Sequence, residues 1–137
     1  MTELAPILSL IPQRPPFLLV DRLVAYTPTE ATSEFEVRPE CPLCHNGMLS
    51  ESGMVENIAQ TCAAYIGYRN LDQEVKIGVI GAIKQLEIMT QPRIGQTIST
   101  TINIEADMFG MLLVKSRTHG AGGELLSTCE MKISLIE

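Results

Sequence analysis

The sequence predicts an α+β domain in which a curved antiparallel sheet wraps around one long buried helix. Residues 52–68 are predicted as a helix and carry a single formal charge among seventeen side chains. About six other runs have the alternating or β-branched pattern of strands. Four of these strands follow the helix in meander order, which favours an antiparallel sheet packed on that helix.

Before the helix, the chain predicts one short helix and two strands. Residues 3–10 can form a short helix, ended by Pro12 and by the pair Pro15-Pro16. Residues 17–26 are rich in Leu and Val and are predicted as a strand. A turn at 27–30 leads to a second predicted strand at 31–37, and a loop with two prolines follows.

The central helix is predicted from about residue 52 to residue 69, with Ser50 or Ser52 as its N-cap. Residues 70–74 form a polar connection. Four strands are predicted after it, at 76–89, 97–107, 110–118 and 124–136, with turn signals at 91–95 and 119–123. No repeat or linker divides the chain, so residues 1–137 are expected to form a single domain.

Composition excludes several classes of function. Ten Lys and Arg against sixteen Asp and Glu give a net charge of −6, and no basic cluster stands out. Binding to nucleic acid or to an anionic membrane is therefore not expected. Residues 1–12 lack the features of a signal peptide, and no apolar run reaches membrane-spanning length. With four cysteines and no secretory signal, reduced thiols and a cytoplasmic location are expected.

Glu56 is the one charged residue within 52–68. A helix without a charged face is expected to be covered on all sides, and a carboxylate inside it costs free energy unless it is used or satisfied. Burial favours the protonated form, and a carboxyl group that keeps its proton can act as a general acid. The alternatives are a glutamate held by backbone amides at the helix start, or one that faces solvent.

Three motifs together resemble a known family. Residues 10–22 read Leu-Ile-Pro-Gln-Arg-Pro-Pro-Phe-Leu-Leu-Val-Asp-Arg, and 56–60 read Glu-Asn-Ile-Ala-Gln. Residues 78–84 read Gly-Val-Ile-Gly-Ala-Ile-Lys and are followed by Pro-Arg-Ile-Gly-Gln at 92–96. In this order they resemble the hot-dog-fold 3-hydroxyacyl-(acyl carrier protein) dehydratases, and most of all the shorter, divergent branch found in aryl-polyene and flexirubin-type pigment pathways.

The resemblance implies a dimer whose sheet continues across the interface, and an acyl thioester substrate on acyl carrier protein or coenzyme A. A histidine would remove the α proton while the helix carboxylate, Glu56, protonates the departing hydroxyl. Amides at the helix start would polarise the thioester carbonyl, with Gly53 allowing close approach. Gln60 lies one turn from Glu56 and can orient it or the acyl oxygen, or else tie down a neighbouring strand. Gly81 and Ala82, in the next strand, are expected in the substrate site, and neither metal nor cofactor is expected.

Two departures from the family pattern affect the predicted base. Met48 stands where the family's Gly-His-Phe-Pro motif has its catalytic histidine, and Gln13 replaces the histidine of the first motif. The chain has only two histidines. His119 lies in a glycine-rich turn and is expected in solvent. His45 precedes the helix by a short loop and is the candidate base, provided that it reaches Glu56 in the same subunit or across the dimer.

A Cys-x-x-Cys-His motif spans Cys41, Cys44 and His45. It matches covalent haem attachment, which the absence of an export signal argues against. A zinc site lacks a second ligand pair at close spacing, since Cys62, His119 and Cys129 are scattered. A thioredoxin-type dithiol would lie at the start of a helix that follows a buried strand, and this motif is not in such a setting. Two ordinary loop cysteines are the favoured interpretation.

Three functions remain open from the sequence. The leading hypothesis is dehydration of a 3-hydroxyacyl thioester to the trans-2-enoyl form, with Glu56 as acid and His45 as base. The second is a non-catalytic hot-dog subunit that pairs with an active dehydratase, favoured by the missing motif histidine. The third is an acyl thioesterase, in which the helix carboxylate activates water.

Overall fold

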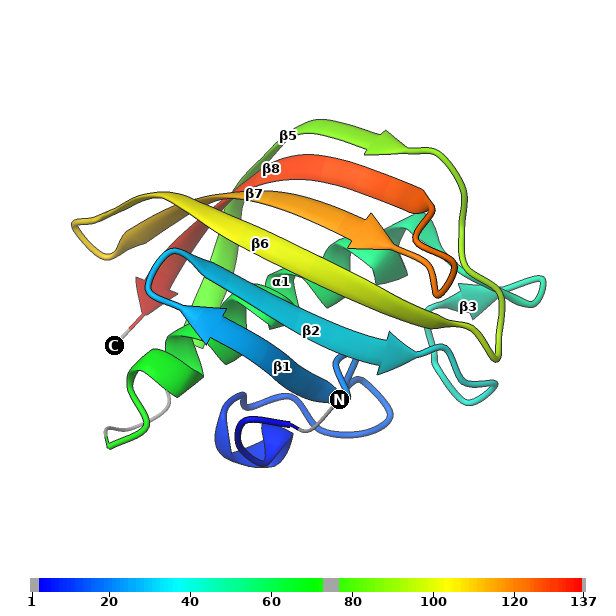
Figure 1. Cartoon of the computed structure of the whole chain (residues 1–137), viewed down its shortest axis with the longest axis horizontal. Coiled ribbons are helices and arrows are strands. Elements are labelled where there is room, and N and C mark those ends of the chain that lie inside the picture. Colours follow the sequence, from blue (N-terminus) through cyan, green and yellow to red (C-terminus); the bar gives the residue numbers. More distant parts are fainter. Residues whose placement is uncertain (1–2, 73–76, 137) are drawn as a thin grey trace.

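The computed structural model describes residues 3–72 and 77–136, and it confirms the α+β prediction. A six-stranded antiparallel sheet curves around one long helix, α1 (Glu51–Arg69), which lies along its concave side (Figure 1). The strands of the sheet are β1 (Arg22–Thr27), β2 (Glu30–Glu36), β5 (Ile77–Ile88), β6 (Thr97–Met108), β7 (Met111–His119) and β8 (Leu125–Ile136).

The order of the strands in the sheet is β1-β2-β6-β7-β8-β5. The expected four-strand meander is therefore only partly correct. β6, β7 and β8 are consecutive neighbours, but β5 pairs with β8 at the far edge and β6 pairs with β2. Alternation along a strand shows which face is buried, whereas the choice of neighbour depends on how the whole sheet closes over α1.

Helix α1 begins and ends as local signals predict. Of the two serines proposed as N-cap, Ser50 has this role, and its Oγ accepts a hydrogen bond from the Gly53 amide at 3.1 Å. At the other end, the Asn70 side chain donates to the Ile66 carbonyl at 2.8 Å. A Cβ on Gly67 would lie 2.0 Å from the Leu10 carbonyl oxygen, so the N-terminal segment packs directly on the helix backbone.

The segment before β1 differs from its prediction. The short helix expected at 3–10 is reduced to one 3₁₀ turn, Ile7–Ser9. The strand expected at 17–26 begins only at Arg22, because the backbone before it bonds to side chains of α1. The Leu19 amide donates to Gln60 Oε1 at 2.7 Å, and the Leu19 carbonyl accepts from Asn57 Nδ2 at 2.7 Å.

The proline-containing loop before α1 holds a short hairpin that was not predicted, with two residues in each strand. It consists of β3 (Cys44–His45) and β4 (Met48–Leu49), joined by Asn46 and Gly47 with φ of 52° and 76°. Asn-Gly is the favoured pair for a tight hairpin with positive φ at both positions, so this dipeptide is the signal that identifies the turn.

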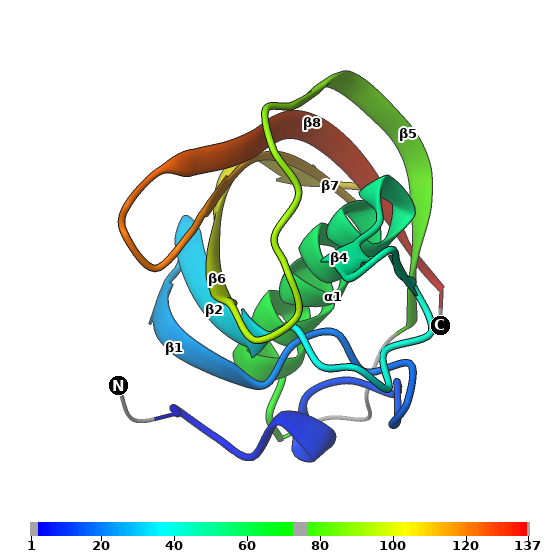
Figure 2. The ribbon, with the colours of Figure 1, turned by 90° about the vertical axis from the view of Figure 1, so that its right-hand side faces the viewer.

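The free edge at β5 is rich in apolar side chains. Figure 2 shows β5 on the same side of the molecule as the N-terminal half of α1 and the loop leading to β4. Long apolar edges invite pairing with another chain, and natural proteins seldom leave them bare. The exposed apolar residues on and just after this strand, each 38–50% accessible, are Val79, Ile80, Ile83, Leu86 and Met89.

Candidate functional site

Glu56 lies in a cavity of about 310 Å³ between the helix and the free edge of the sheet. Helix α1 contributes Glu56, Ala59 and Ala63, which share one face because they are three to four residues apart. The other lining residues come from the N-terminal segment, from the start of β5 and from β8, namely Pro12, Gln13, Gly78, Val79, Ile80 and Ile133.

This face of α1 is only partly covered by the described residues. Glu56, Ala59 and Ala63 are half-buried, whereas most of the helix is fully buried. The expectation that the helix is wrapped on all sides is thus not met within one subunit. The partly covered helix face and the start of β5 border the same cavity.

Gln60 fixes the Glu56 carboxylate. Its Nε2 donates to Glu56 Oε2 at 2.8 Å and to the Phe17 carbonyl at 2.9 Å, and its Oε1 accepts from the Leu19 amide at 2.7 Å. The amide is therefore held by two backbone groups of the segment before β1. Gln60 thus hydrogen-bonds both Glu56 and the neighbouring segment, and its predicted role toward the substrate stays a prediction.

Gln13 contributes the only other polar side chain to the described lining of this cavity. Its Oε1 is buried and has no hydrogen-bond partner among the described residues. Buried acceptors in native proteins are nearly always satisfied, so such an atom needs an explanation. Sequence reasoning singled out Gln13 only as a departure from the family motif and did not place it beside Glu56.

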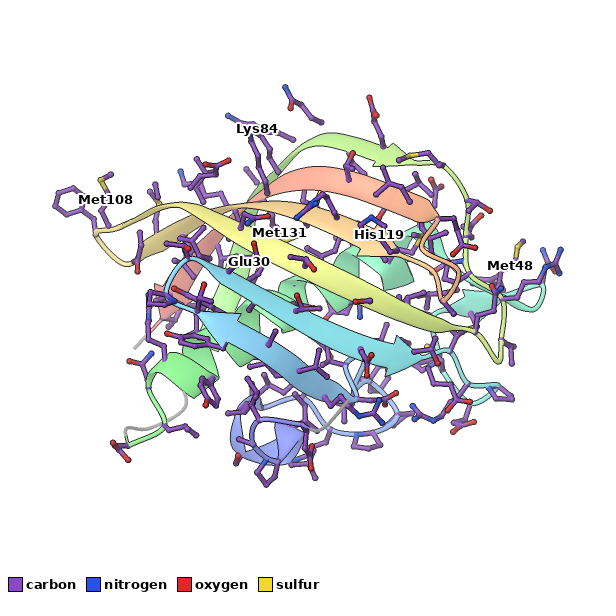
Figure 3. All side chains as sticks on the ribbon, viewed as in Figure 1. Glu30, Met48, Lys84, Met108, His119 and Met131 are labelled. Carbon is purple, nitrogen blue, oxygen red and sulfur yellow. The ribbon has the colours of Figure 1, made fainter. Side chains whose placement is uncertain are left out.

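Neither histidine lines the cavity of Glu56 within the described subunit. His45 is exposed in the β3–β4 hairpin, where it pairs with Met48, the residue at the family's histidine position. Figure 3 shows Met48 at the end of the molecule where this hairpin lies. His119 is half-buried at the end of β7, not in open solvent as expected. The role of His45 as the base therefore stays a prediction.

The three small residues expected at the substrate lie in different surroundings. Gly53 is buried under the hairpin, where a Cβ would approach Leu49 Cδ1 to 2.5 Å, so its small size serves packing. Gly81 and Ala82 lie at a register irregularity of β5. The part of β5 that lines the cavity is Gly78, Val79 and Ile80, just before these two residues.

All four cysteines are free thiols, and two of them meet in the loop before α1. Burial and the neighbouring Cys41 raise the pKa of Cys44 to about 11, so its thiol stays protonated near neutral pH. Within residues 3–72 and 77–136, no three His, Cys, Asp or Glu side chains are grouped to hold a metal ion. Cys41 lies in the loop and Cys44 in β3, and neither forms a disulfide.

The site combines a fixed carboxyl group, an amide oxygen without a partner among the described residues, and otherwise apolar side chains. It suits proton transfer to or from a small polar group on an apolar ligand, and it opens toward the free sheet edge. No helix in the described parts of the chain has the length and apolar character needed to cross a membrane.

A six-stranded antiparallel sheet curved around one central helix defines a hot-dog fold. The family model for ApeP-like proteins, described as ApeP dehydratase, matches residues 5–133. The chain therefore belongs to the ApeP-like dehydratase family. Comparison with curated protein sequences finds no match.

Solved structures with the same fold include dehydratase and thioesterase proteins. A chain of the dehydratase heterocomplex ApeI:P from Xenorhabdus doucetiae is similar with a TM-score of 0.89 and 13% identity, covering 97% of this chain and 92% of that one. The PaaI protein of the E. coli phenylacetic acid degradation operon is similar with a TM-score of 0.66 and 10% identity, covering 82% of this chain and 80% of that one. Zebrafish thioesterase superfamily member 2 is similar with a TM-score of 0.66 and 14% identity, covering 85% of this chain and 80% of that one.

Proposed function

We propose that this chain takes part in dehydrating a 3-hydroxyacyl thioester to the trans-2-enoyl thioester, with Glu56 as the general acid. The substrate would be carried by an acyl carrier protein or coenzyme A, in fatty-acid or polyene-type biosynthesis in the cytoplasm. The observation that supports this most is the Glu56 carboxyl group, which Gln60 holds at 2.8 Å at the wall of a cavity whose other side chains, apart from Gln13, are apolar.

The reaction needs one base and one acid. A base removes the α proton, and the electrons of that C–H bond form the Cα–Cβ double bond as the Cβ–O bond breaks. Glu56 gives its proton to the departing oxygen, which leaves as water, and the carboxylate then regains a proton for the next turnover. The apolar side chains around Glu56 help to keep bulk water away from the reacting groups.

The base is proposed to come from a second hot-dog subunit that pairs along β5. In a homodimer this base would be His45 of the other copy, because His45 is exposed and no histidine of the same subunit lines the described cavity. In a heterodimer it would be a group of the partner. The heterocomplex of the similar Xenorhabdus doucetiae protein supports pairing between different hot-dog chains.

Two alternatives are each supported by one observation. Met48 at the family's histidine position favours a non-catalytic subunit that only contributes interface and tunnel to an active dehydratase. The similarity in fold to a thioesterase superfamily member favours an acyl thioesterase, in which Glu56 would activate water for attack on the thioester.

The test follows a 3-hydroxyacyl thioester by mass spectrometry, with the chain alone and with a second hot-dog protein. Dehydration gives the enoyl thioester, whereas a thioesterase releases the free acid. We expect Glu56→Gln to lower enoyl formation about a hundredfold or more while the fold stays intact. His45→Ala should abolish turnover of the homodimer without dissociating it.

Each alternative has its own result. If the chain is active only with a second hot-dog protein, and Glu56→Gln leaves that activity unchanged, the chain is the non-catalytic partner. If Glu56→Gln removes the activity of the mixed complex but His45→Ala does not, the site is composite and the other protein supplies the base.

A further inference from the structure

Gln13 is a polar residue of the Glu56 cavity that the proposed reaction does not yet use. Its Oε1 is buried without a donor, and the only other described side-chain atom in this condition, Ser127 Oγ, belongs to a residue that does not line this cavity. Leaving an acceptor buried and unsatisfied costs stability, because it gives up the hydrogen bond to water and gains none. A ligand that donates a hydrogen bond would remove this cost.

We propose that Gln13 is a positioning residue that accepts the hydrogen of the substrate's 3-hydroxyl group, while Glu56 supplies the proton to the oxygen of the same group. This inference rests on the proposed dehydration. It assigns Gln13 the task of distinguishing a 3-hydroxyacyl thioester from its enoyl product, since only the substrate has this hydroxyl group.

The composition of the cavity wall supports the assignment. Among the described lining residues, Glu56 and Gln13 carry the polar side chains, and the others are Pro, Ala, Gly, Val and Ile. Glu56 Oε2 already accepts from Gln60, and the other carboxyl oxygen must carry the proton that is transferred. Gln13 Oε1 is therefore the side-chain acceptor left for the hydroxyl hydrogen, and because this atom is closed to solvent, the amide must turn to bring it into the cavity.

The chemistry gives this acceptor a function. A hydroxyl group that donates its hydrogen to Gln13 turns a lone pair of its oxygen away from Gln13 and leaves it free to take the proton of Glu56. Without an acceptor, the hydroxyl hydrogen can instead point at Glu56. The proton of Glu56 then faces a hydrogen rather than a lone pair of the hydroxyl oxygen. Fixing the hydroxyl group thus raises the fraction of bound substrate that is ready to react.

The backbone around Gln13 is held firmly enough for such a role. Arg14 Nη1 donates to the Ile11 and Gln13 carbonyl oxygens, both at 2.8 Å, and Nη2 donates to the Leu8 carbonyl at 3.0 Å. The same segment packs on α1 through the close contact of Leu10 with Gly67. The terminal torsion of a glutamine is soft, so the amide can turn toward a donor while its backbone stays in place.

The test compares the wild-type protein with Gln13→Leu, which keeps a similar size and removes the amide, in the active assembly. Two constants are measured, kcat/KM for the 3-hydroxyacyl thioester and the inhibition constant of the enoyl thioester. We expect Gln13→Leu to lower kcat/KM about tenfold or more, as the loss of one buried hydrogen bond allows, and to leave enoyl binding unchanged. Gln13→His, which offers a ring nitrogen as acceptor, should recover part of the loss.

A control variant, Gln91→Leu, removes an amide that does not line the cavity and should change neither constant. Thermal unfolding of Gln13→Leu should show unchanged or higher stability, because the orphaned oxygen is gone. The inference is overturned if Gln13→Leu changes both constants equally, changes neither, or lowers stability while Gln13→His recovers no activity. If the wild-type assembly forms no enoyl product at all, the proposed function itself has failed, which is a separate result.

Discussion

Gln60 should contribute more to stability than any single surface glutamine, because it joins α1 to the segment before β1 and also holds Glu56. Substitution by Leu keeps a similar volume but removes all three of its hydrogen bonds. The largest loss is at Leu19, which is fully buried, so its N–H would be left without an acceptor. We expect this to cost about 1–3 kcal/mol.

The other two bonds contribute less. Phe17 is 58% exposed, so its carbonyl can turn to water, and Glu56 is half-buried beside an open cavity. Together they add about 1 kcal/mol to the loss at Leu19. The expected loss is therefore about 2–4 kcal/mol, or a fall in Tm of about 8–16 °C at about 4 °C per kcal/mol for a domain of this size.

The assay is thermal unfolding followed by circular dichroism, at fixed protein concentration because the chain is expected to associate. Gln91→Leu is the matched control, because it is the same substitution at a half-buried glutamine with one hydrogen bond, to the Leu49 carbonyl at 3.0 Å. It should cost about 1 kcal/mol. A Tm for Gln60→Leu no lower than that of Gln91→Leu would refute the assignment of Gln60 as the tie between α1 and the preceding segment.

Three further predictions address packing, association and thiol chemistry. Gly67→Ala should destabilise by about 1–3 kcal/mol despite the better helix propensity of Ala, because the new Cβ would lie 2.0 Å from the Leu10 carbonyl oxygen. In the control variant Gly81→Ala the new Cβ meets nothing closer than 3.6 Å, so this protein should fold normally. Chemical denaturation compares the stability of the two variants. Ile83→Lys, at a 40% exposed site on β5, should shift the protein from dimer to monomer in sedimentation at micromolar concentration, and a wild-type protein that is already monomeric would contradict the pairing along β5. Cys44 should react slowly with iodoacetamide at pH 7.5 and faster as the pH rises toward its raised pKa of about 11, and rapid labelling of folded protein at neutral pH would show that the thiol is not held protonated.

The sequence determined the elements and the identity of the acid candidate, because both depend on local patterns. A seventeen-residue stretch with one charge can be stable only as a mostly covered helix, and this fixed α1 and drew attention to Glu56. Alternation located the strands that follow the helix to within a few residues. The strand expected from residue 17 started late, since side chains of α1 took over the backbone bonds of residues 17–19.

Tertiary structure alone decided which residues share the site. Gln13 and Glu56 come from distant parts of the chain and meet only because the N-terminal segment packs on α1 and the start of β5 passes beside both. The same packing placed β5 at the edge next to β8 and left His45 on an exposed hairpin that does not line the described Glu56 cavity. Contacts of this kind depend on how apolar faces are buried when the whole chain folds, and the spacing of residues along the sequence does not encode them.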